Sequence, residues 1–421
     1  MALHLFRWIS ATASGFAFYY PLFMSYLWMA GALFYFFHYE QRRFAAVEDP
    51  PPMHDYPFVA VLVPCFNEGD NVVEVMSSMM RLKYPNYEII AINDGSSDDT
   101  GAALARLSAR YPRLRVVDLR KNQGKAAALN IGACMTRAEF LVCVDGDAVL
   151  DPYAIHWLMT HFDSGRVGAV TGNPRVRTRS TLLGRIQVGE FSSIVGLIKR
   201  AQRTYGRVFT VSGVVACFRK KALFDVGLWS TDMLTEDVDI SWKLQTRHWD
   251  VRFEPRALCW ILMPETMKGL WRQRLRWATG GAQVLMKNLP TLSSWRQRRM
   301  WPVFIEYMTS VLWAYTMAAL IAMWLFAAWL GIPVEDRTPI LIPQWEGLLI
   351  GTTCLLQVAV SMLLDGRYDK GLGRHYYWMI WYPLAYWLIN VATSVVALPR
   401  AMFRSKGKRA RWTSPDRGLR P

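Results

Sequence analysis

The sequence predicts a doubly wound α/β domain that is attached to a membrane by apolar segments on both sides. Between residues 58 and 144, short Val- and Ile-rich runs alternate with patterns of helical period, which is typical of a buried parallel sheet. Long apolar runs precede and follow this region, and 52% of the 421 residues are hydrophobic, with 19 Trp among them. This hydrophobic content is higher than that of an ordinary soluble enzyme and indicates a membrane protein.

The first apolar run, Phe16 to His38, is long enough to cross the roughly 30 Å hydrocarbon core of a bilayer. A cleaved signal peptide is disfavoured because the run is too long and no small-residue cleavage site follows it. Arg42-Arg43 at its end predict, by the positive-inside rule, that the next domain is cytoplasmic. We therefore expect a transmembrane helix within residues 1–45 and a Pro-rich linker over residues 46–57.

Residues 58–290 form the predicted cytoplasmic domain. Its first half should hold four parallel strands, at Phe58 to Val63, Tyr87 to Ile92, Leu114 to Leu119 and Phe140 to Val144. The helices between them are expected at Asp70 to Leu82, Thr100 to Arg110 and Lys125 to Thr136. Such sheets bind ligands at the carboxyl ends of their strands. Polar clusters follow these strands, at Asn67-Glu68, Asn93 to Asp99 and Asp145 to Asp147.

The second half of the domain mixes expected strands, Val167 to Thr171 and Val208 to Ser212, with amphipathic stretches. Leu182 to Arg203 and Met267 to Lys287 carry apolar residues at helical spacing beside Arg and Lys. We expect both to be interfacial helices that lie flat in the cytoplasmic interface of the membrane, and ordinary helices that pack on the sheet are the alternative.

Three more apolar runs fall within residues 291–400, at Val303 to Ile332, Ile340 to Leu364 and Tyr376 to Leu398. Three full crossings would place the basic tail, residues 401–421, outside the cell, against the positive-inside rule. Pro383 interrupts the last run. One of the three can therefore be re-entrant or interfacial, where protein or water satisfies the broken backbone.

The formal net charge of +16 gathers beside apolar segments, as at Arg296 to Arg299 and Arg404 to Arg411. This placement favours a bilayer with anionic headgroups over nucleic acid, for which no zinc finger, helix-turn-helix or aromatic RNA-binding pattern is present. The six cysteines include no CxxC pair, which predicts buried free thiols in a reducing compartment. They are Cys65, Cys134, Cys143, Cys217, Cys259 and Cys354.

Asp145-Gly146-Asp147 follows an apolar strand and predicts a divalent metal site with Asp147 as ligand. In a transfer from a nucleoside diphosphate, such a cation neutralises the departing group. Oxygen ligands suit Mg²⁺ or Mn²⁺ better than zinc. A plain strand-to-loop turn is the alternative. Asp94, at another strand end, can accept hydrogen bonds from a uracil or ribose, while Ser97 or Asp98 can cap the next helix without any ligand.

Thr235-Glu236-Asp237 offers a carboxylate to remove the proton of an acceptor hydroxyl, and Asp237 is the predicted base, with Glu236 beside it as a second catalytic candidate. A structural helix start, with Thr235 as N-cap, is the alternative. In Gln273 to Trp277, the residues at i, i+3 and i+4 share one helical face. Arg276 can neutralise a diphosphate and Trp277 can stack on a sugar ring, whereas Trp271 and Arg272 suit a membrane boundary.

These motifs, together with Pro64 to Glu68, Gly124-Lys125 and Ser212-Gly213, resemble the processive family 2 glycosyltransferases, which include cellulose, hyaluronan and chitin synthases. The resemblance covers about residues 58–290 and implies a GT-A fold, a Rossmann-like nucleotide-sugar-binding domain. Three further segments are similar to the bacterial poly-β-1,6-N-acetyl-D-glucosamine synthases. They are Thr171 to Thr181, Glu254 to Thr266 and Arg409 to Gly418.

The resemblance implies an inverting enzyme of the bacterial inner membrane that polymerises UDP-N-acetylglucosamine into a biofilm exopolysaccharide. It also implies a small membrane partner subunit and activation by cyclic di-GMP, although no PilZ-like module is present and the Arg400/Arg404 pair suits a membrane flank. The implied donor site contains Asn67, Glu68, Asp94, Lys125, Asp145, Gln273 and Arg276, with Trp277 at the acceptor.

Two alternatives stay open. One is a transferase that adds a single sugar to a polyprenyl-phosphate lipid, and such enzymes usually lack the Gln-x-x-Arg-Trp set. The other is a transporter or scaffold with a degenerate domain, and the presence of both Asp147 and Asp237 disfavours it.

Overall fold

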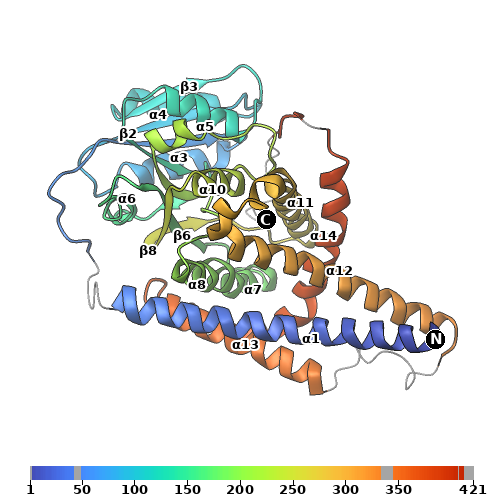
Figure 1. The fold of residues 1–421 in the computed structure, drawn as a ribbon. Coiled ribbons are helices and arrows are strands. Elements are labelled where there is room, and N and C mark those ends of the chain that lie inside the picture. The colour runs from blue at the N-terminus through green and yellow to red at the C-terminus, as the bar shows by residue number, and fades with distance from the viewer. Residues whose placement is uncertain (1, 42–48, 333–344, 406, 412–421) are drawn as a thin grey trace.

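The computed structural model describes residues 2–41, 49–332, 345–405 and 407–411 (Figure 1). A central sheet with helices on both faces forms one part of the molecule. Below it, the long helices α1 (Ala2–Tyr35) and α13 (Trp345–Asp365) lie side by side, and α12 (Trp301–Trp329) runs along α1 toward the N-terminus. Arg42-Arg43, the start of the predicted run at Ile340 and most of the tail segment from Arg409 to Gly418 lie outside the described residues.

The sheet has eight strands in the order β3-β2-β1-β4-β7-β6-β8-β5. Strands β1 to β4 are parallel, as predicted, whereas β7 runs antiparallel to both β4 and β6, so the sheet as a whole is mixed. The strands are β1 Val59–Cys65, β2 Tyr87–Asn93, β3 Leu114–Asp118, β4 Phe140–Val144, β5 Val149–Leu150, β6 Val167–Val176, β7 Val215–Arg219 and β8 Asp250–Ile261.

Helices connect and cover these strands, and the three expected between the first four strands are present within a few residues of the predicted ends. They are α3 Gly69–Met79, α4 Thr100–Arg110, α5 Lys125–Cys134, α6 Ala154–Met159, α7 Leu182–Phe191, α8 Ile198–Thr204, α9 Lys220–Asp225, α10 Glu236–Thr246, α11 Met267–Leu292 and α14 Tyr382–Met402. Segments of other helix types are η1 Phe36–Glu40, η2 Ser192–Leu197, η3 Trp295–Met300 and η6 Leu372–Trp381.

Alternate side chains of the central strands pack into two separate hydrophobic cores, one on each face of the sheet. In β1, Val59, Val61 and Val63 pack with residues of α3 and α4, whereas Ala60 and Leu62 pack with residues of α5 and α10 on the other face. Since strand side chains alternate between faces, a continuous apolar run is what a sheet covered on both sides requires. The doubly wound prediction is therefore confirmed for this half of the domain.

The strand expected at Val208 to Ser212 is wrong. Within this segment only an isolated bridge joins Ser212 to Val215, and the strand begins at Val215. Side chains take the place of a neighbouring strand, because the Val208 N–H donates to Gln245 Oε1 at 3.0 Å and the Val211 N–H donates to Ser241 Oγ at 2.7 Å. The Val side chains of the segment are buried, which accounts for its apolar sequence. The spacing of apolar residues cannot distinguish a buried loop of this kind from a buried strand.

The amphipathic stretch from Leu182 to Arg203 forms α7, η2 and α8 in succession, and most of it is buried. α8 packs against α1, η2 against α13 and α7 against η6, so these helices lie between the sheet and the apolar helices. This enclosure favours the packing alternative for this stretch. In α11 the Trp271 and Arg272 side chains are exposed, as the membrane-boundary interpretation expects.

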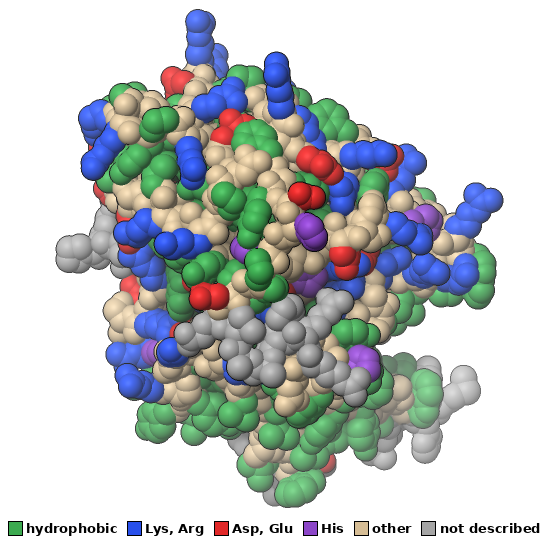
Figure 2. All heavy atoms as spheres, turned by 90° about the vertical axis from the view of Figure 1, so that its left-hand side faces the viewer, with side chains coloured by type: hydrophobic (Ala, Val, Ile, Leu, Met, Phe, Trp, Pro, Cys, Tyr) green, Lys and Arg blue, Asp and Glu red, His purple; other side chains and the backbone are tan. Residues whose placement is uncertain are grey.

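In the part of the chain that the structure describes, three helical segments are long and apolar enough to cross a membrane, Trp8–Glu40, Trp295–Trp329 and Trp345–Asp365. A fourth candidate is the pair Leu372–Trp381 and Tyr386–Met402, which bends by 70° close to Pro383. The predicted interruption of the last run is therefore present. Figure 2 shows hydrophobic side chains gathered on the lower part of the molecule and Lys and Arg side chains spread over the sheet domain above it.

Two prolines inside these helices are accommodated by side chains of α12. Pro21 of α1 has no N–H for the Ala17 carbonyl, and Trp313 Nε1 donates to that oxygen at 2.9 Å. Pro399 of α14 frees the Val395 carbonyl in the same way, and the Tyr315 hydroxyl donates to it at 3.0 Å. α12 thus fastens both neighbours by satisfying the backbone groups that their prolines release.

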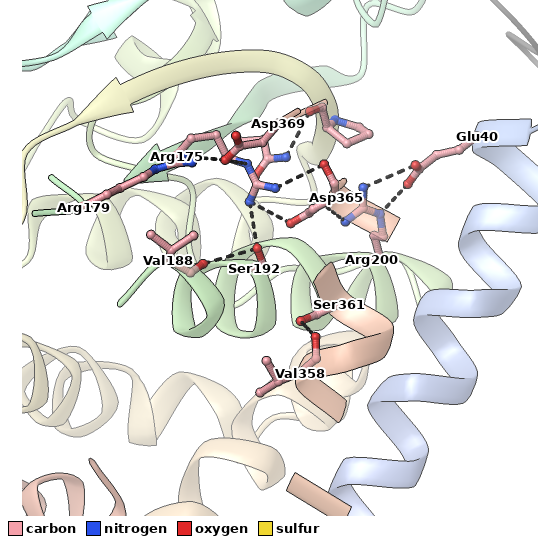
Figure 3. A network of polar contacts seen from close by, with 12 residues as sticks. Glu40, Arg175, Arg179, Val188, Ser192, Arg200, Val358, Ser361, Asp365 and Asp369 are labelled. Carbon is pink, nitrogen blue, oxygen red and sulfur yellow. Dashed lines mark hydrogen bonds and ion pairs between the residues drawn. The ribbon is translucent and has the colours of Figure 1, made fainter. Parts of the chain in front are cut away.

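A buried network of charges joins the sheet domain to α1 and α13. Arg175 of β6 and Arg200 of α8 converge on Asp365 at the end of α13, and Glu40 reaches Arg200 from the end of η1 (Figure 3). The nitrogen-to-oxygen distances are 2.8 Å for Arg175–Asp365, 2.7 Å for Arg200–Asp365 and 2.6 Å for Arg200–Glu40. Asp369 adds a further carboxylate. Buried charges are tolerated only when they are paired in this way.

We predict that Asp365→Ala destabilises the protein by about 3–5 kcal/mol, because it leaves two buried guanidinium groups short of a partner. The melting temperature of the protein in detergent should fall clearly below that of the parent. The control is Glu139→Ala, which breaks an ion pair with Arg219 whose carboxylate side chain is 61% exposed. Such pairs contribute about 0–1 kcal/mol. Equal melting temperatures for the two variants would contradict a structural role for the network.

Candidate active site

A cavity of about 460 Å³ opens at the carboxyl ends of the parallel strands and continues to the apolar helices α1 and α12. Eight residues predicted from the motifs line it. They are Lys125, Asp145, Asp147, Glu236, Asp237, Gln273, Arg276 and Trp277. Residues that are up to 152 positions apart in the chain therefore meet in one space, as the motif analysis expected.

The reversal of β7 explains why Ser212-Gly213 joins this edge. β7 pairs antiparallel with β4, with Val215 opposite Val144, so the loop before β7 meets the loop after β4. Gly146 is required by the close approach of β1, since a Cβ there would lie 3.0 Å from Glu68 Cγ and 3.1 Å from the Pro64 carbonyl oxygen. Packing against β1 therefore explains why a glycine lies between the two aspartates.

Lys125, the first residue of α5, connects three parts of the site. Its Nζ lies 2.5 Å from Asp145 Oδ1 and 3.1 Å from Glu236 Oε1, and it donates to the Gly213 carbonyl at 3.1 Å. Burial by itself would lower the pKa of Lys125, but Asp145 and Glu236 outweigh it and the pKa is raised. The lysine is therefore a permanent cation that holds two carboxylates of the cavity wall.

The two aspartates of Asp145-Gly146-Asp147 have different surroundings. Burial raises the pKa of Asp145; the Lys125 ammonium opposes the rise and the neighbouring Asp147 carboxylate adds to it. Among the described residues no group of three His, Cys, Asp or Glu side chains comes close enough to hold a metal alone. Asp147 and Asp145 nevertheless fit a Mg²⁺ or Mn²⁺ ion, because such ions take one or two carboxylates and complete their shell with phosphate oxygens and water.

Asp237 and Glu236 begin α10, and only one of them is engaged by a cation. Burial raises the pKa of Asp237 and the adjacent Glu236 charge adds to the rise, although Lys125 opposes it. Burial would also raise the pKa of Glu236, but Lys125, a backbone N–H and Arg276 together outweigh it and the pKa is lowered. The helix-start alternative is weakened, because the Thr235 side chain makes no capping hydrogen bond. The role of Asp237 as base stays a prediction, whereas Glu236 is an ion-pair partner of Lys125.

The three motif residues of α11 point into the cavity, and their neighbour Arg274 holds the helix in place. Arg274 Nη2 lies 2.6 Å from Glu190 Oε2 of α7, and its guanidinium carbon lies 4.6 Å from the centre of the Trp277 ring. The Gln273 amide oxygen is buried without a hydrogen-bond partner in the described part of the chain. That oxygen is therefore available to a substrate donor.

Three predicted donor-site residues, Asn67, Glu68 and Asp94, lie behind the cavity and do not line it. Asp94 is fully buried, and its two carboxylate oxygens accept the N–H groups of Gln123 at 2.7 Å and Gly124 at 2.8 Å. These bonds place Lys125, the next residue in the chain. Direct contact of Asp94 with a nucleotide stays a prediction, whereas its support of the Lys125 loop is structural.

The loops around Asn67 and Glu68 are also tied together. Asn67 Oδ1 accepts the Ser97 N–H at 2.9 Å, and the Glu68 N–H donates to the Thr100 hydroxyl at 2.8 Å. Asp98 Oδ1 accepts the Thr100 N–H at 3.1 Å and so binds the first N–H of α4, although the N-cap residue of that helix is Asp99. These bonds fix the ends of β1 and β2 relative to each other and shape the nucleotide end of the cavity.

Sequence reasoning missed the residues at the membrane end of the cavity. Lys199 and Gln202 of α8, Trp28 of α1 and Glu306 of α12 line it. Glu306 Oε1 accepts from Trp28 Nε1 at 3.2 Å and from Gln202 Nε2 at 3.0 Å. None belongs to a recognisable motif. The available signal was a single charge inside an apolar run, which in a membrane segment is a functional indication.

The C-terminal segment also returns to the domain. The Ala410 N–H donates to the Thr231 carbonyl at 2.9 Å, and Arg409 Nη1 donates to Gln123 Oε1. Gly124 has a φ of 92°, and a Cβ there would collide with the Ala410 carbonyl oxygen. The residues after α14 therefore lie on the same loop that Asp94 supports, about 285 positions earlier in the chain.

Comparison with known proteins identifies relatives of this chain by sequence. Residues 56–280 match the sequence family described as "Glycosyltransferase like family 2". A Staphylococcus epidermidis protein named poly-β-1,6-N-acetyl-D-glucosamine synthase is 38% identical over 405 residues, which cover 96% of this chain and 98% of the relative. The protein of that name from Staphylococcus aureus is 38% identical over 404 residues, with the same coverage.

Among solved structures, a mannosyltransferase from Pyrobaculum calidifontis, determined with GDP-Man and Mn²⁺, superimposes with a TM-score of 0.60. The match covers 94% of this chain and 99% of that one at 18% sequence identity. At this identity the likeness concerns the fold alone.

Proposed function

Since this chain belongs to the family 2 glycosyltransferases, we propose that it polymerises N-acetylglucosamine from UDP-N-acetylglucosamine into a β-1,6-linked exopolysaccharide of biofilms, with inversion at the anomeric carbon. The membership bears out the resemblance inferred from the motifs, and the GT-A fold class is borne out with it. The donor, the linkage and the product rest on relatives that are 38% identical over almost the whole of both chains.

One observation of the molecule carries the polymerase proposal. The cavity joins the nucleotide end, marked by Asp145 and Asp147, to residues of the apolar helices, marked by Trp28 and Glu306. A donor that enters from the cytoplasm and an acceptor chain that leaves toward the membrane would meet in this single space. The base Asp237 and the flat Trp277 ring lie along the same cavity, where an acceptor sugar would be held.

The residues around the cavity suit a one-step displacement. Asp237 would take the proton of the acceptor hydroxyl while the hydroxyl oxygen forms its bond to the anomeric carbon on the face opposite the leaving group. The bond from that carbon to the diphosphate oxygen breaks in the same step, and UDP leaves with the bonding electrons. Arg276, which lines the cavity, can bind the departing diphosphate, whose charge favours a guanidinium.

A divalent cation fits the nucleotide end. Asp147 would hold it, with Asp145 beside it, and the cation would supply charge neutralisation for the leaving diphosphate. Lys125 keeps Asp145 and Glu236 in place whether or not a metal is bound, because its charge is balanced by these carboxylates.

The transfer of one sugar to a polyprenyl phosphate is the second candidate. It would need cations to bind the lipid phosphate at the membrane end of the cavity. That end instead carries the Glu306 carboxylate, and the one lysine near it, Lys199, shares the cavity with Asp237. Because a phosphate there would face two carboxylates, the site favours an uncharged sugar acceptor.

The first test is the incorporation of radiolabelled sugar by membranes that contain the protein. We expect polymer from UDP-N-acetylglucosamine but not from UDP-glucose, complete digestion by a β-1,6-specific hexosaminidase, and no product in a metal chelator unless Mg²⁺ or Mn²⁺ is restored. A short lipid-linked product would reject polymerisation. A polymer that resists the hexosaminidase would reject the linkage.

We predict that Asp237→Asn lowers polymer synthesis by about 10²–10⁴-fold, the usual contribution of a general base, while UDP binding stays within about twofold of the parent. The matched control on the same helix is Asp239→Asn, whose carboxylate pairs with Lys287 outside the cavity. That variant should lower the melting temperature and leave the rate per folded molecule nearly unchanged. An unchanged polymer yield with Asp237→Asn would exclude this residue as the base.

We propose that α12 and α13 cross the membrane and that η6 and α14 turn back without a full crossing. Gly407 to Arg411 contacts Gln123 and Thr231 of the domain, so both lie on one side of the bilayer. The chain between them must then cross an even number of times. This arrangement keeps the basic tail with the catalytic domain, and the positive-inside rule assigns both to the cytoplasm of a multi-pass inner-membrane protein.

Cysteine labelling tests this topology in a Cys134→Ala background, which removes the exposed native cysteine. Lys408→Cys in the tail and Arg110→Cys on α4 should both react with a membrane-impermeant maleimide in inside-out vesicles and not in right-side-out vesicles. Reaction of Lys408→Cys in right-side-out vesicles, with Arg110→Cys protected, would show that η6 and α14 complete a third crossing.

A small membrane partner subunit and activation by cyclic di-GMP, which the resemblance implies, also remain proposals. Arg404 of the Arg400/Arg404 pair donates to the Lys408 carbonyl at 3.2 Å, and thus has a structural role within the tail.

A further inference from the structure

Three basic side chains of α8 are buried or half-buried, and only Lys199 has no carboxylate partner. Arg200 pairs with Glu40 and Asp365, and Arg203 pairs with Asp250 at 3.0 Å. The Lys199 side chain is also buried, with 4% of the residue exposed, yet within the described ranges no carboxylate oxygen lies within 4.0 Å of its Nζ. The structure of α8 therefore explains two of its cations and leaves the third unexplained.

The single hydrogen bond of Lys199 leaves most of its donor capacity unused. Its Nζ donates to Thr171 Oγ1 at 3.2 Å, and in the part of the chain that the structure describes no other hydrogen bond of this ammonium is found. An ammonium group has three N–H donors. The rest of its surroundings are apolar on one side, where Nζ lies 5.9 Å from the centre of the Phe253 ring. On the other side it borders the cavity.

Burying a cation in this way costs free energy unless something compensates it. Desolvation lowers the pKa of Lys199 to about 7, and the Asp237 carboxylate opposes that shift. Lys125, by contrast, is less buried and is held by two carboxylates. Residues that are kept at the expense of stability are characteristic of binding and catalytic sites.

The position of Lys199 in the cavity identifies its ligand. It lies on the same cavity as the base Asp237 and the sugar-stacking Trp277, while its neighbour Gln202 borders the cavity one turn further along α8. The nucleotide end already has its own cations, Lys125 and Arg276. A group bound by Lys199 would therefore belong to the acceptor rather than to the donor.

We propose that Lys199 is an acceptor-positioning residue, whose ammonium donates a hydrogen bond to a hydroxyl or N-acetyl oxygen of the terminal acceptor sugar and so orients the attacking hydroxyl toward Asp237. This inference rests on the proposed function, since it takes a sugar as the acceptor. It assigns Lys199 no part in bond breaking, because the proton goes to Asp237 and the leaving group departs at the other end of the cavity.

The test compares Lys199→Met with the parent in purified, detergent-solubilised protein. The probes are UDP-N-acetylglucosamine as donor and a soluble β-1,6-linked N-acetylglucosamine oligosaccharide as acceptor. We expect the KM for the acceptor to rise about tenfold, as the loss of one charge-assisted hydrogen bond implies. The Kd of UDP should change by less than about twofold, since UDP binds at the other end of the cavity.

Stability separates this role from a structural one. Lys199→Met should keep or raise the melting temperature, because it removes an uncompensated buried charge. Lys287→Met is the matched control, since Lys287 pairs with the fully buried Asp239 at 2.6 Å outside the cavity. It should lower the melting temperature and leave the acceptor KM unchanged. Lys199→Arg, which retains donors, should recover part of the acceptor affinity.

Two results would overturn the inference. One is an acceptor KM for Lys199→Met within twofold of the parent. The other is a rise in KM accompanied by weaker UDP binding and a lower melting temperature, which would make Lys199 a structural residue. Failure of the proposed function gives a different result, which is seen in the parent protein without any substitution. The parent would then transfer one sugar to a polyprenyl phosphate and none to the oligosaccharide.

Discussion

The arrangement of the molecule depends on one buried carboxylate, Asp365, which two guanidinium groups share. Arg175 belongs to the sheet and Arg200 to the helix beneath it, while Asp365 ends an apolar helix and Glu40 follows another. Charges that are removed from water must find their partners, so this network permits few positions of α1 and α13 relative to the sheet. The network therefore fixes the position of the apolar helices α1 and α13 relative to the sheet domain. Apolar contacts alone would not fix it, because they are not directional.

The cavity is a consequence of that fixed position. Its nucleotide end is built from strand ends, and its other end is built from α8, α1 and α12, which are held by the Glu306 hydrogen bonds. α12 in turn is fixed to α1 and α14 through the carbonyls that Pro21 and Pro399 release. A space that links the two parts exists only because both are held rigidly, and a transferase whose acceptor moves toward the membrane requires such a space.

The basic side chains in and beside the cavity are of two kinds, those paired with a carboxylate and those without such a partner. Lys125 is neutralised by carboxylates of two elements and keeps the nucleotide end in shape, and Arg274 is neutralised by Glu190 and supports Trp277. Arg276 and Lys199 border the cavity without any carboxylate within salt-bridge distance in the described part of the chain. The paired cations thus maintain the structure, and the two without a paired acid are those that we propose bind substrates, Arg276 the donor and Lys199 the acceptor.

The sequence by itself determined the parallel half of the sheet and the motif residues that gather at its edge. These are local properties, since the period of apolar residues reveals a strand, and parallel strand ends share one edge wherever the chain goes between them. Only the tertiary structure decided the rest. Val208 to Ser212 is not a strand because Gln245 and Ser241 bind its backbone. Asp94 supports a loop, and Lys199 lines the same cavity as Asp237. Each depends on side chains brought together from distant positions, which no local pattern encodes.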